Sequence, residues 1–134
     1  MRKVLGVIVG VVAAIATITV IELISHTLFP PPTGIDMNDP LQASRFVDLM
    51  SMPAKISVVA AWFLGAAVGA FAALNIARWS VAGWFVAATV VTGAISSFMM
   101  IPHPMWMQVA GILLPIAGVL MVARIVPSTI NGST

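Results

Sequence analysis

The chain has 134 residues, of which 60% are hydrophobic and 7% carry a charged side chain. A soluble domain has about a quarter charged residues, so this chain lacks the polar surface needed to face water over most of its area. Six basic residues exceed four acidic ones, but they are scattered, which excludes the clustered basic stripe of a nucleic-acid-binding protein. With no cysteine, the chain offers no disulfide, thiolate nucleophile or Cys-ligated metal site. These features indicate a single all-α membrane domain over residues 1–134.

The first apolar segment, about residues 4–28, is long enough to cross a hydrocarbon core of roughly 30 Å. A basic start and the sequence Ala14-Ile15-Ala16, which resembles a cleavage site, would also suit a secretory signal. The apolar run continues beyond that point, so we expect an uncleaved spanning helix. Small residues recur in it every four positions, a pattern that lets helices approach closely in lipid: Gly6, Gly10 and Ala14.

Three prolines at residues 30–32 must end this helix, because proline lacks an N–H donor and holds the preceding residue extended. Asp39 as N-cap, Pro40 at the first position and Gln42 as capping-box partner predict a short helix that reaches about residue 50. Its mildly amphipathic sequence is typical of a helix lying at a membrane interface.

Three further spans are expected at about residues 54–77, 81–101 and 104–126. The second span carries a GxxxG motif within a longer small-residue stripe, which predicts the closest helix packing in the protein: Ala61, Gly65, Gly69 and Ala73. The motif leaves open whether the partner helix is internal or belongs to another subunit. Pro115 should kink the fourth span by freeing the carbonyl of Gly111. Residues 128–134 are polar and are expected to fray.

The basic residues indicate the orientation. Four of them would share one side of a four-span bundle, namely Arg2, Lys3, Arg78 and Arg124, and only Arg45 and Lys55 would lie on the other. The positive-inside rule then places both termini in the cytoplasm. All four acidic residues and both histidines fall towards the outer side.

Glu22, His26 and His103 form the candidate polar cluster at the outer face. Glu22 and His26 are separated by one helical turn, so they project from one face about 6 Å apart along the axis. His103 lies in the turn between the third and fourth spans, which returns to the same depth. An ionised, unpaired Glu22 in lipid would cost several kcal/mol, so we expect it to face the bundle interior with a partner.

Four hypotheses fit this cluster. We favour a structural role, in which hydrogen bonds among the three side chains tie the helix ends together. The second hypothesis is transport or the handling of protons or ions, because intramembrane acid and imidazole groups do this in pumps. A metal site with the same three ligands ranks third, and an enzyme using Glu22 and His26 as a base ranks last. No catalytic residue or cofactor is assigned. A methionine group around the His103 turn could suggest a copper-type site, but gap filling is preferred for these residues: Met99, Met100, Met105 and Met107.

Two motifs carry a resemblance. The segments Glu22-x-x-Ser25-His26-x-Leu-Phe-Pro-Pro-Pro-x-Gly34-x-Asp36 and Met100-Ile-Pro-His103-Pro-x-Trp106 resemble those of a family of small bacterial four-span inner-membrane proteins. The likeness covers most of the chain, including residues 61–65. It implies a multi-pass protein of the bacterial inner membrane and supplies no mechanism, since that family has no assigned function. The expected partners are the lipid bilayer and further copies of the chain in a homo-oligomer.

Overall fold

A computed structural model describes residues 1–30 and 32–126, and these residues form an all-helical structure without strands. The helices are α1 (Arg2–Leu28), α2 (Pro40–Leu49), α3 (Met52–Ala77), α4 (Ser80–Met100) and α5 (Met105–Ile125). The all-α prediction is therefore confirmed. Four of the helices, α1, α3, α4 and α5, are long and apolar enough to cross a membrane.

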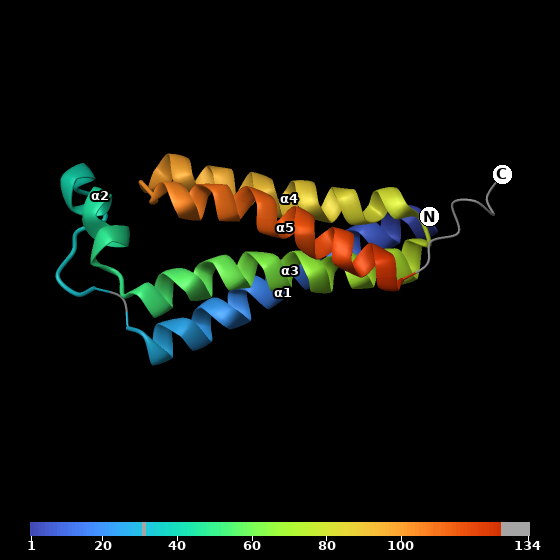
Figure 1. Cartoon of the computed structure of the whole chain (residues 1–134), viewed down its shortest axis with the longest axis horizontal. Coiled ribbons are helices and arrows are strands. Elements are labelled where there is room, and N and C mark those ends of the chain that lie inside the picture. Colours follow the sequence, from blue (N-terminus) through green and yellow to red (C-terminus); the bar gives the residue numbers. More distant parts are fainter. Residues whose placement is uncertain (31, 127–134) are drawn as a thin grey trace.

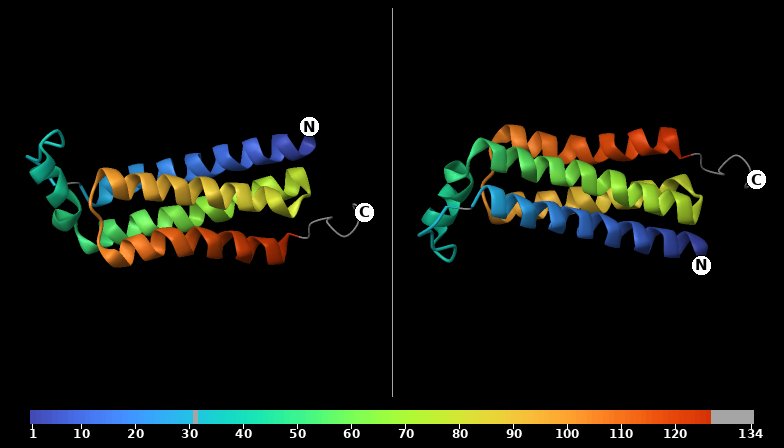
Figure 2. Two further views of the ribbon diagram at one scale, coloured as in Figure 1. Left: turned by 90° about the horizontal axis from the view of Figure 1, so that it is seen from above. Right: turned by 90° about the horizontal axis from the view of Figure 1, so that it is seen from below.

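The four long helices run side by side as an elongated bundle, and α2 lies across one end of it (Figures 1 and 2). The N-terminus lies at the opposite end, where α3 connects to α4 and α5 finishes. We call these the α2 end and the N-terminal end of the bundle. Helices α3 and α4 each pack against the other three long helices, whereas α1 and α5 each pack mainly against α3 and α4.

The short helix α2 is started by the expected cap. The Asp39 carboxylate accepts a hydrogen bond from the Leu41 N–H at 3.0 Å, and Pro40 occupies the first helical position. Gln42 does not complete the expected capping box. Its side chain donates to the Asp39 carboxylate at 3.1 Å and accepts from the Asp36 N–H at 2.8 Å, because the Asp39 N–H already donates to the Asp36 carbonyl. The glutamine thus ties the preceding loop to the helix start.

The connections between the long helices are short. Helix α3 ends at Arg78, which adopts the left-handed conformation at φ 51° and donates its N–H to the Leu74 carbonyl. Trp79 then precedes α4 directly, so α3 and α4 are antiparallel neighbours. At the α2 end, residues 101–104 join α4 to α5, and the Pro104 carbonyl accepts from the N–H groups of Met107 and Gln108.

Helix α5 passes Pro115 as a single helix, and the proline ring is fully buried. The kink expected at Pro115 stays a prediction. The expected fraying of residues 128–134 lies outside the described part of the chain.

Candidate functional site

A cavity of about 450 Å³ opens in the half of the bundle nearest α2, and we call it the chamber. In Figure 1 the pair α1 and α3 diverges from the pair α4 and α5 towards that end. All five helices and the α4–α5 turn contribute to its wall. The residues that line it are Ile15, Ile18, Glu22 and His26 of α1; Phe46, Val47 and Met50 at α2; Val58 and Trp62 of α3; Thr89, Val90, Gly93 and Ser97 of α4; and Ile101, His103 and Met107.

The chamber ends where α1 crosses α3. A Cβ atom placed on Gly10 would lie 2.6 Å from the Ala73 Cβ and 2.7 Å from the Gly69 carbonyl oxygen. One placed on Gly69 would lie 2.6 Å from the Gly10 carbonyl oxygen and 2.8 Å from a methyl group of Val86 on α4. Three helices therefore meet here with no room for a further atom, and this contact closes the chamber towards the N-terminal end.

The small-residue stripe of α3 lies at this crossing. Its Gly65 position faces α1, because an added Cβ would meet the Ile18 side chain at 2.5 Å and the Ala14 carbonyl at 3.0 Å. Ala61 and Ala73 are completely buried. The partner of the GxxxG motif in this structure is thus a helix of the same chain, a point that spacing alone had left open.

Glu22 is half-buried on α1 and lines the chamber. Within residues 1–30 and 32–126 its carboxylate makes no hydrogen bond or ion pair, and His26 lies one turn away on the same helix. No buried polar side-chain atom of the described chain lacks a partner, so the carboxylate oxygens must remain accessible. The two carboxylate oxygens of Glu22 are therefore exposed in largely apolar surroundings and accept no hydrogen bond from the described residues.

His26 lies one turn beyond Glu22 on α1, closer to the end of the helix. Its side chain is exposed, and it lines both the chamber and a small adjoining hollow beneath α2. Ser25 beside it is buried at 7% exposure and turns towards α3, where Ala54 and Val58 share the hollow. The imidazole therefore stands at the rim of the chamber rather than inside it.

His103 is held firmly in the α4–α5 turn. Its ring lies edge-on to Phe98 with the centroids 5.0 Å apart, and 6.4 Å from the Trp62 ring. The Nδ1 atom lies 2.6 Å from the Ile101 carbonyl oxygen, which requires a proton on Nδ1. In the neutral ring, Nε2 is then an acceptor. Gln108 fixes the turn further by donating to the His103 carbonyl at 2.9 Å.

The structure brings Glu22, His26 and His103 to one chamber without joining them. No hydrogen bond links any two of them within the described residues; His103 is bonded instead to its own turn. No group of three His, Cys, Asp or Glu side chains in the same part of the chain is arranged to hold a metal ion. The geometry therefore lends no support to the three-ligand metal hypothesis.

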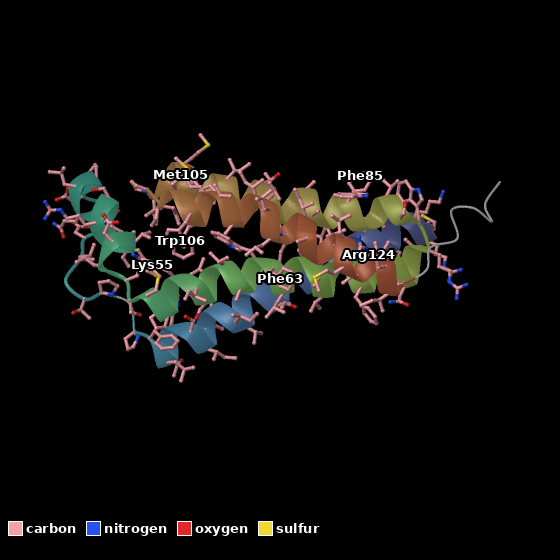
Figure 3. The ribbon with its side chains drawn as sticks, viewed as in Figure 1. Lys55, Phe63, Phe85, Met105, Trp106 and Arg124 are labelled. Carbon is pink, nitrogen blue, oxygen red and sulfur yellow. The ribbon has the colours of Figure 1, made fainter. Side chains whose placement is uncertain are left out.

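The methionines around the His103 turn point in different directions. Met107 is buried at 1% exposure and lines the chamber, whereas Met99, Met100 and Met105 are each more than 70% exposed. Figure 3 shows Met105 directed away from the bundle. These sulfur atoms do not converge on one point, which agrees with a role in packing for Met107.

Sequence reasoning missed the aromatic wall of the chamber. Trp62 is only 6% exposed and meets Phe98 edge-on, with ring centroids 5.7 Å apart. Gly111 of α5 makes room for both rings, since a Cβ there would lie 2.7 Å from Phe98 and 2.8 Å from Trp62. A tryptophan placed within a span, away from the interfaces, was the available signal for a polar or aromatic site.

Comparison of the chain with family models, with curated proteins and with solved structures found no match. The resemblance to small bacterial four-span proteins therefore stays a prediction. The fold and the chamber geometry are the observations from which a function can be argued.

Proposed function

We propose that the chain is a multi-pass protein of a bacterial inner membrane, with its N-terminal end on the cytoplasmic side. Four apolar helices of sufficient length support insertion. The basic residues Arg2, Lys3, Arg78 and Arg124 belong to the N-terminal end, which supports the orientation by the positive-inside rule. Helix α2 would then lie at the outer interface, with Leu41 and Leu49 exposed to lipid and Val47 turned to the bundle.

We further propose that the chamber binds a small amphiphilic cation, of the protonated-amine class, from the outer side. The observation that carries this function is the exposed Glu22 carboxylate on a largely apolar cavity. A carboxylate left without a donor in such surroundings costs several kcal/mol, and a bound cation would remove that cost.

The polar groups of the chamber include strong acceptors, beside the His26 ring and the Ser97 hydroxyl, which can also donate. Glu22 offers two carboxylate oxygens and His103 offers Nε2, while the Thr89 hydroxyl already donates its proton to the Phe85 carbonyl at 2.9 Å. No lysine or arginine is among the described residues of the wall. A protonated amine would donate its N–H groups to the Glu22 carboxylate and to Nε2 of His103, and its charge would balance that of Glu22.

The rest of the wall favours a ligand with an apolar body. Aliphatic side chains of four helices surround the cavity, and Phe46 and Trp62 add aromatic surface. Aromatic faces attract cations, which strengthens the match to an ammonium group. A volume of about 450 Å³ falls within the range of small-molecule sites, roughly 300–1,000 Å³.

Transport of the bound cation would be an extension of this function. It is suggested by a chamber that is open towards α2 and closed towards the N-terminal end. The chamber is closed by the contact of Gly10 with Gly69 and Val86, so a ligand could pass to the N-terminal end only if α1 separated from α3 and α4. Four short helices enclose little space for a continuous path. A homo-oligomer in which two chains share a path is the arrangement we propose for that step.

Calorimetric titration of the purified protein in detergent tests the binding function. The probe is protonated 2-phenylethylamine, and the matched neutral probe is 2-phenylethanol, each also titrated into empty micelles. We expect the amine to bind and Glu22→Gln to raise its Kd ten- to a hundred-fold, because hydrogen bonds to charged groups contribute about 1.5–3 kcal/mol. Asp48→Asn is the control, since Asp48 is an exposed acid of α2 outside the chamber.

The structural hypothesis for the cluster gives the opposite result. In this hypothesis Glu22 would hold the helix ends together, although the described structure bonds the His103 ring to the Ile101 carbonyl of its own turn. If Glu22 serves only folding, Glu22→Gln should lower the unfolding temperature and leave amine binding no weaker than in Asp48→Asn. Equal binding of the amine and the alcohol would also overturn the cation proposal.

A further inference from the structure

A second hollow lies at the other end of the molecule, on the outside of the bundle. It is a groove of about 390 Å³ between the first turns of α1 and the start of α4. Its wall consists of Lys3, Val4, Val7, Ile8, Trp79 and Phe85. Apart from the Lys3 ammonium, these side chains offer the groove only hydrocarbon and aromatic surface. An apolar groove of this kind on the outside of a membrane protein is suited to an acyl chain.

A cation is held at the mouth of the groove. The Lys3 Nζ atom lies 5.1 Å from the centroid of the Trp79 ring, and that ring in turn lies 6.1 Å from the Phe85 ring. Contact with an aromatic face leaves ammonium N–H groups available, because the face accepts the charge and not three directed hydrogen bonds. Lys3 is thus positioned over the apolar wall, and its ammonium N–H groups can donate to a ligand.

The surroundings of the groove are positively charged. Arg2 continues the basic edge and donates from Nε to the Ile76 carbonyl at 2.8 Å, which holds its guanidinium beside the α3 terminus. Arg124 of α5 lies towards the same end, as does Phe85 (Figure 3). All four acidic residues of the chain lie between residues 22 and 48, far from this end in the described structure. The local field therefore favours an anion.

We propose that this groove binds one anionic phospholipid of the cytoplasmic leaflet. An acyl chain lies against Val4, Val7 and Phe85, and the headgroup phosphate pairs with Lys3. Free phosphate would use only the cation and leave the apolar wall exposed, so the combination of both features selects a lipid. The site rests on the membrane insertion proposed above and is independent of the cation chamber.

Quenching of Trp79 fluorescence by brominated lipids tests the site. The protein carries Trp62→Phe, Trp84→Phe and Trp106→Phe, so that Trp79 is its one remaining tryptophan. It is reconstituted into phosphatidylcholine bilayers that contain a minor fraction of brominated phosphatidylglycerol or, in parallel, of brominated phosphatidylcholine. We expect the anionic lipid to be preferred near Trp79 about five-fold, the effect of one basic residue at an anionic surface. Lys3→Gln should abolish this preference.

Two further variants separate a built site from diffuse attraction. Val4→Phe places a ring in the groove and keeps every charge, so it should remove the preference if an acyl chain occupies the groove. Val20→Phe is the matched control on α1, since Val20 is similarly exposed but outside the groove.

A preference that survives Val4→Phe, or one that Lys3→Gln leaves intact, would overturn the proposal. Failure of the protein to enter bilayers at all would instead overturn the membrane proposal. The two failures are therefore distinguishable.

Discussion

Towards the N-terminal end of the bundle α1 packs without a gap against α3, whereas towards the α2 end the same helix lines an open chamber. The difference follows the size of its side chains. Gly6, Gly10 and Ala14 let the backbone of α1 approach α3 until an added Cβ would overlap it. One to two turns later, Ile18 and Glu22 stand in the equivalent place and face the cavity. A single helix therefore packs closely at one end of the bundle and lines a cavity at the other. We call the part around Gly6, Gly10 and Ala14 the closed half, and the part around the chamber the open half.

The two halves also differ in what stabilises them. In lipid, helices gain little from apolar burial itself, so close van der Waals contact between small residues has to supply much of the association energy. The closed half provides that contact, and the open half gives it up and adds a carboxylate without a hydrogen-bond partner. Such a distribution is typical of proteins whose functional site is less stable than its scaffold.

The largest expected effect comes from a methyl group added to the closed half. In Gly69→Ala the new Cβ would lie 2.6 Å from the Gly10 backbone oxygen, which cannot move aside as a flexible side chain would. We expect a loss of about 2 kcal/mol in the free energy of unfolding, the usual cost of overpacking. Thermal unfolding in detergent, followed by circular dichroism, measures it.

Gly93→Ala is the matched change in the open half. Nothing lies within 4 Å of a Cβ at Gly93, so we expect no loss and a gain of about 0.5–1 kcal/mol from the better helix former. Equal effects at the two glycines would contradict the division of the bundle into a closed and an open half.

The next effect concerns the cost of the carboxylate in the open half. Glu22→Leu removes a polar group that has no hydrogen-bond partner within the described residues, so we expect the unfolding free energy to rise by about 1–2 kcal/mol. Chemical unfolding in mixed micelles would show the rise. A fall in stability would mean that Glu22 holds the helices together, as the structural hypothesis states.

The last prediction concerns a local effect in α2, which lies over the open half. Val47 is buried at 2% exposure against the bundle, while the Asp39 cap supports the helix start. Asp39→Ala should weaken α2 by about 1 kcal/mol. Hydrogen exchange of the amides of residues 41–49 should then accelerate about five-fold, with α3 amides unchanged as the internal control. Unchanged exchange in α2 would show that its contacts with the chamber, and not its cap, hold it in place.

Local features of the structure follow directly from the sequence. Ser51 accepts from the Ala54 N–H at 3.4 Å at the start of α3, and Phe29 ends α1 just before Pro30, because caps and prolines act on their own neighbours. The expectation that Glu22, His26 and His103 would form hydrogen bonds with one another could not be judged from neighbouring residues alone. It depended on how far α1 stands from the α4–α5 turn, a distance set by packing elsewhere.

The aromatic wall illustrates the same limit. Trp62 and Phe98 lie on different helices, and their meeting requires the space left by Gly111 on a third helix. The spacing of residues within α3 or α4 does not predict the space beside Gly111. The glycine became informative only when the three helices were seen together.

By itself, the sequence determined the helices, their approximate ends and their apolar character, because backbone hydrogen bonding and capping are local and lipid crossing depends on length and hydropathy. The tertiary structure alone decided that the small residues of α1 meet those of α3, and that Glu22, His26 and His103 share a chamber without a hydrogen bond between them. Contacts between distant segments depend on the shape of every side chain between them. A periodic pattern indicates which face of a helix carries small side chains, but it does not indicate which helix packs against that face.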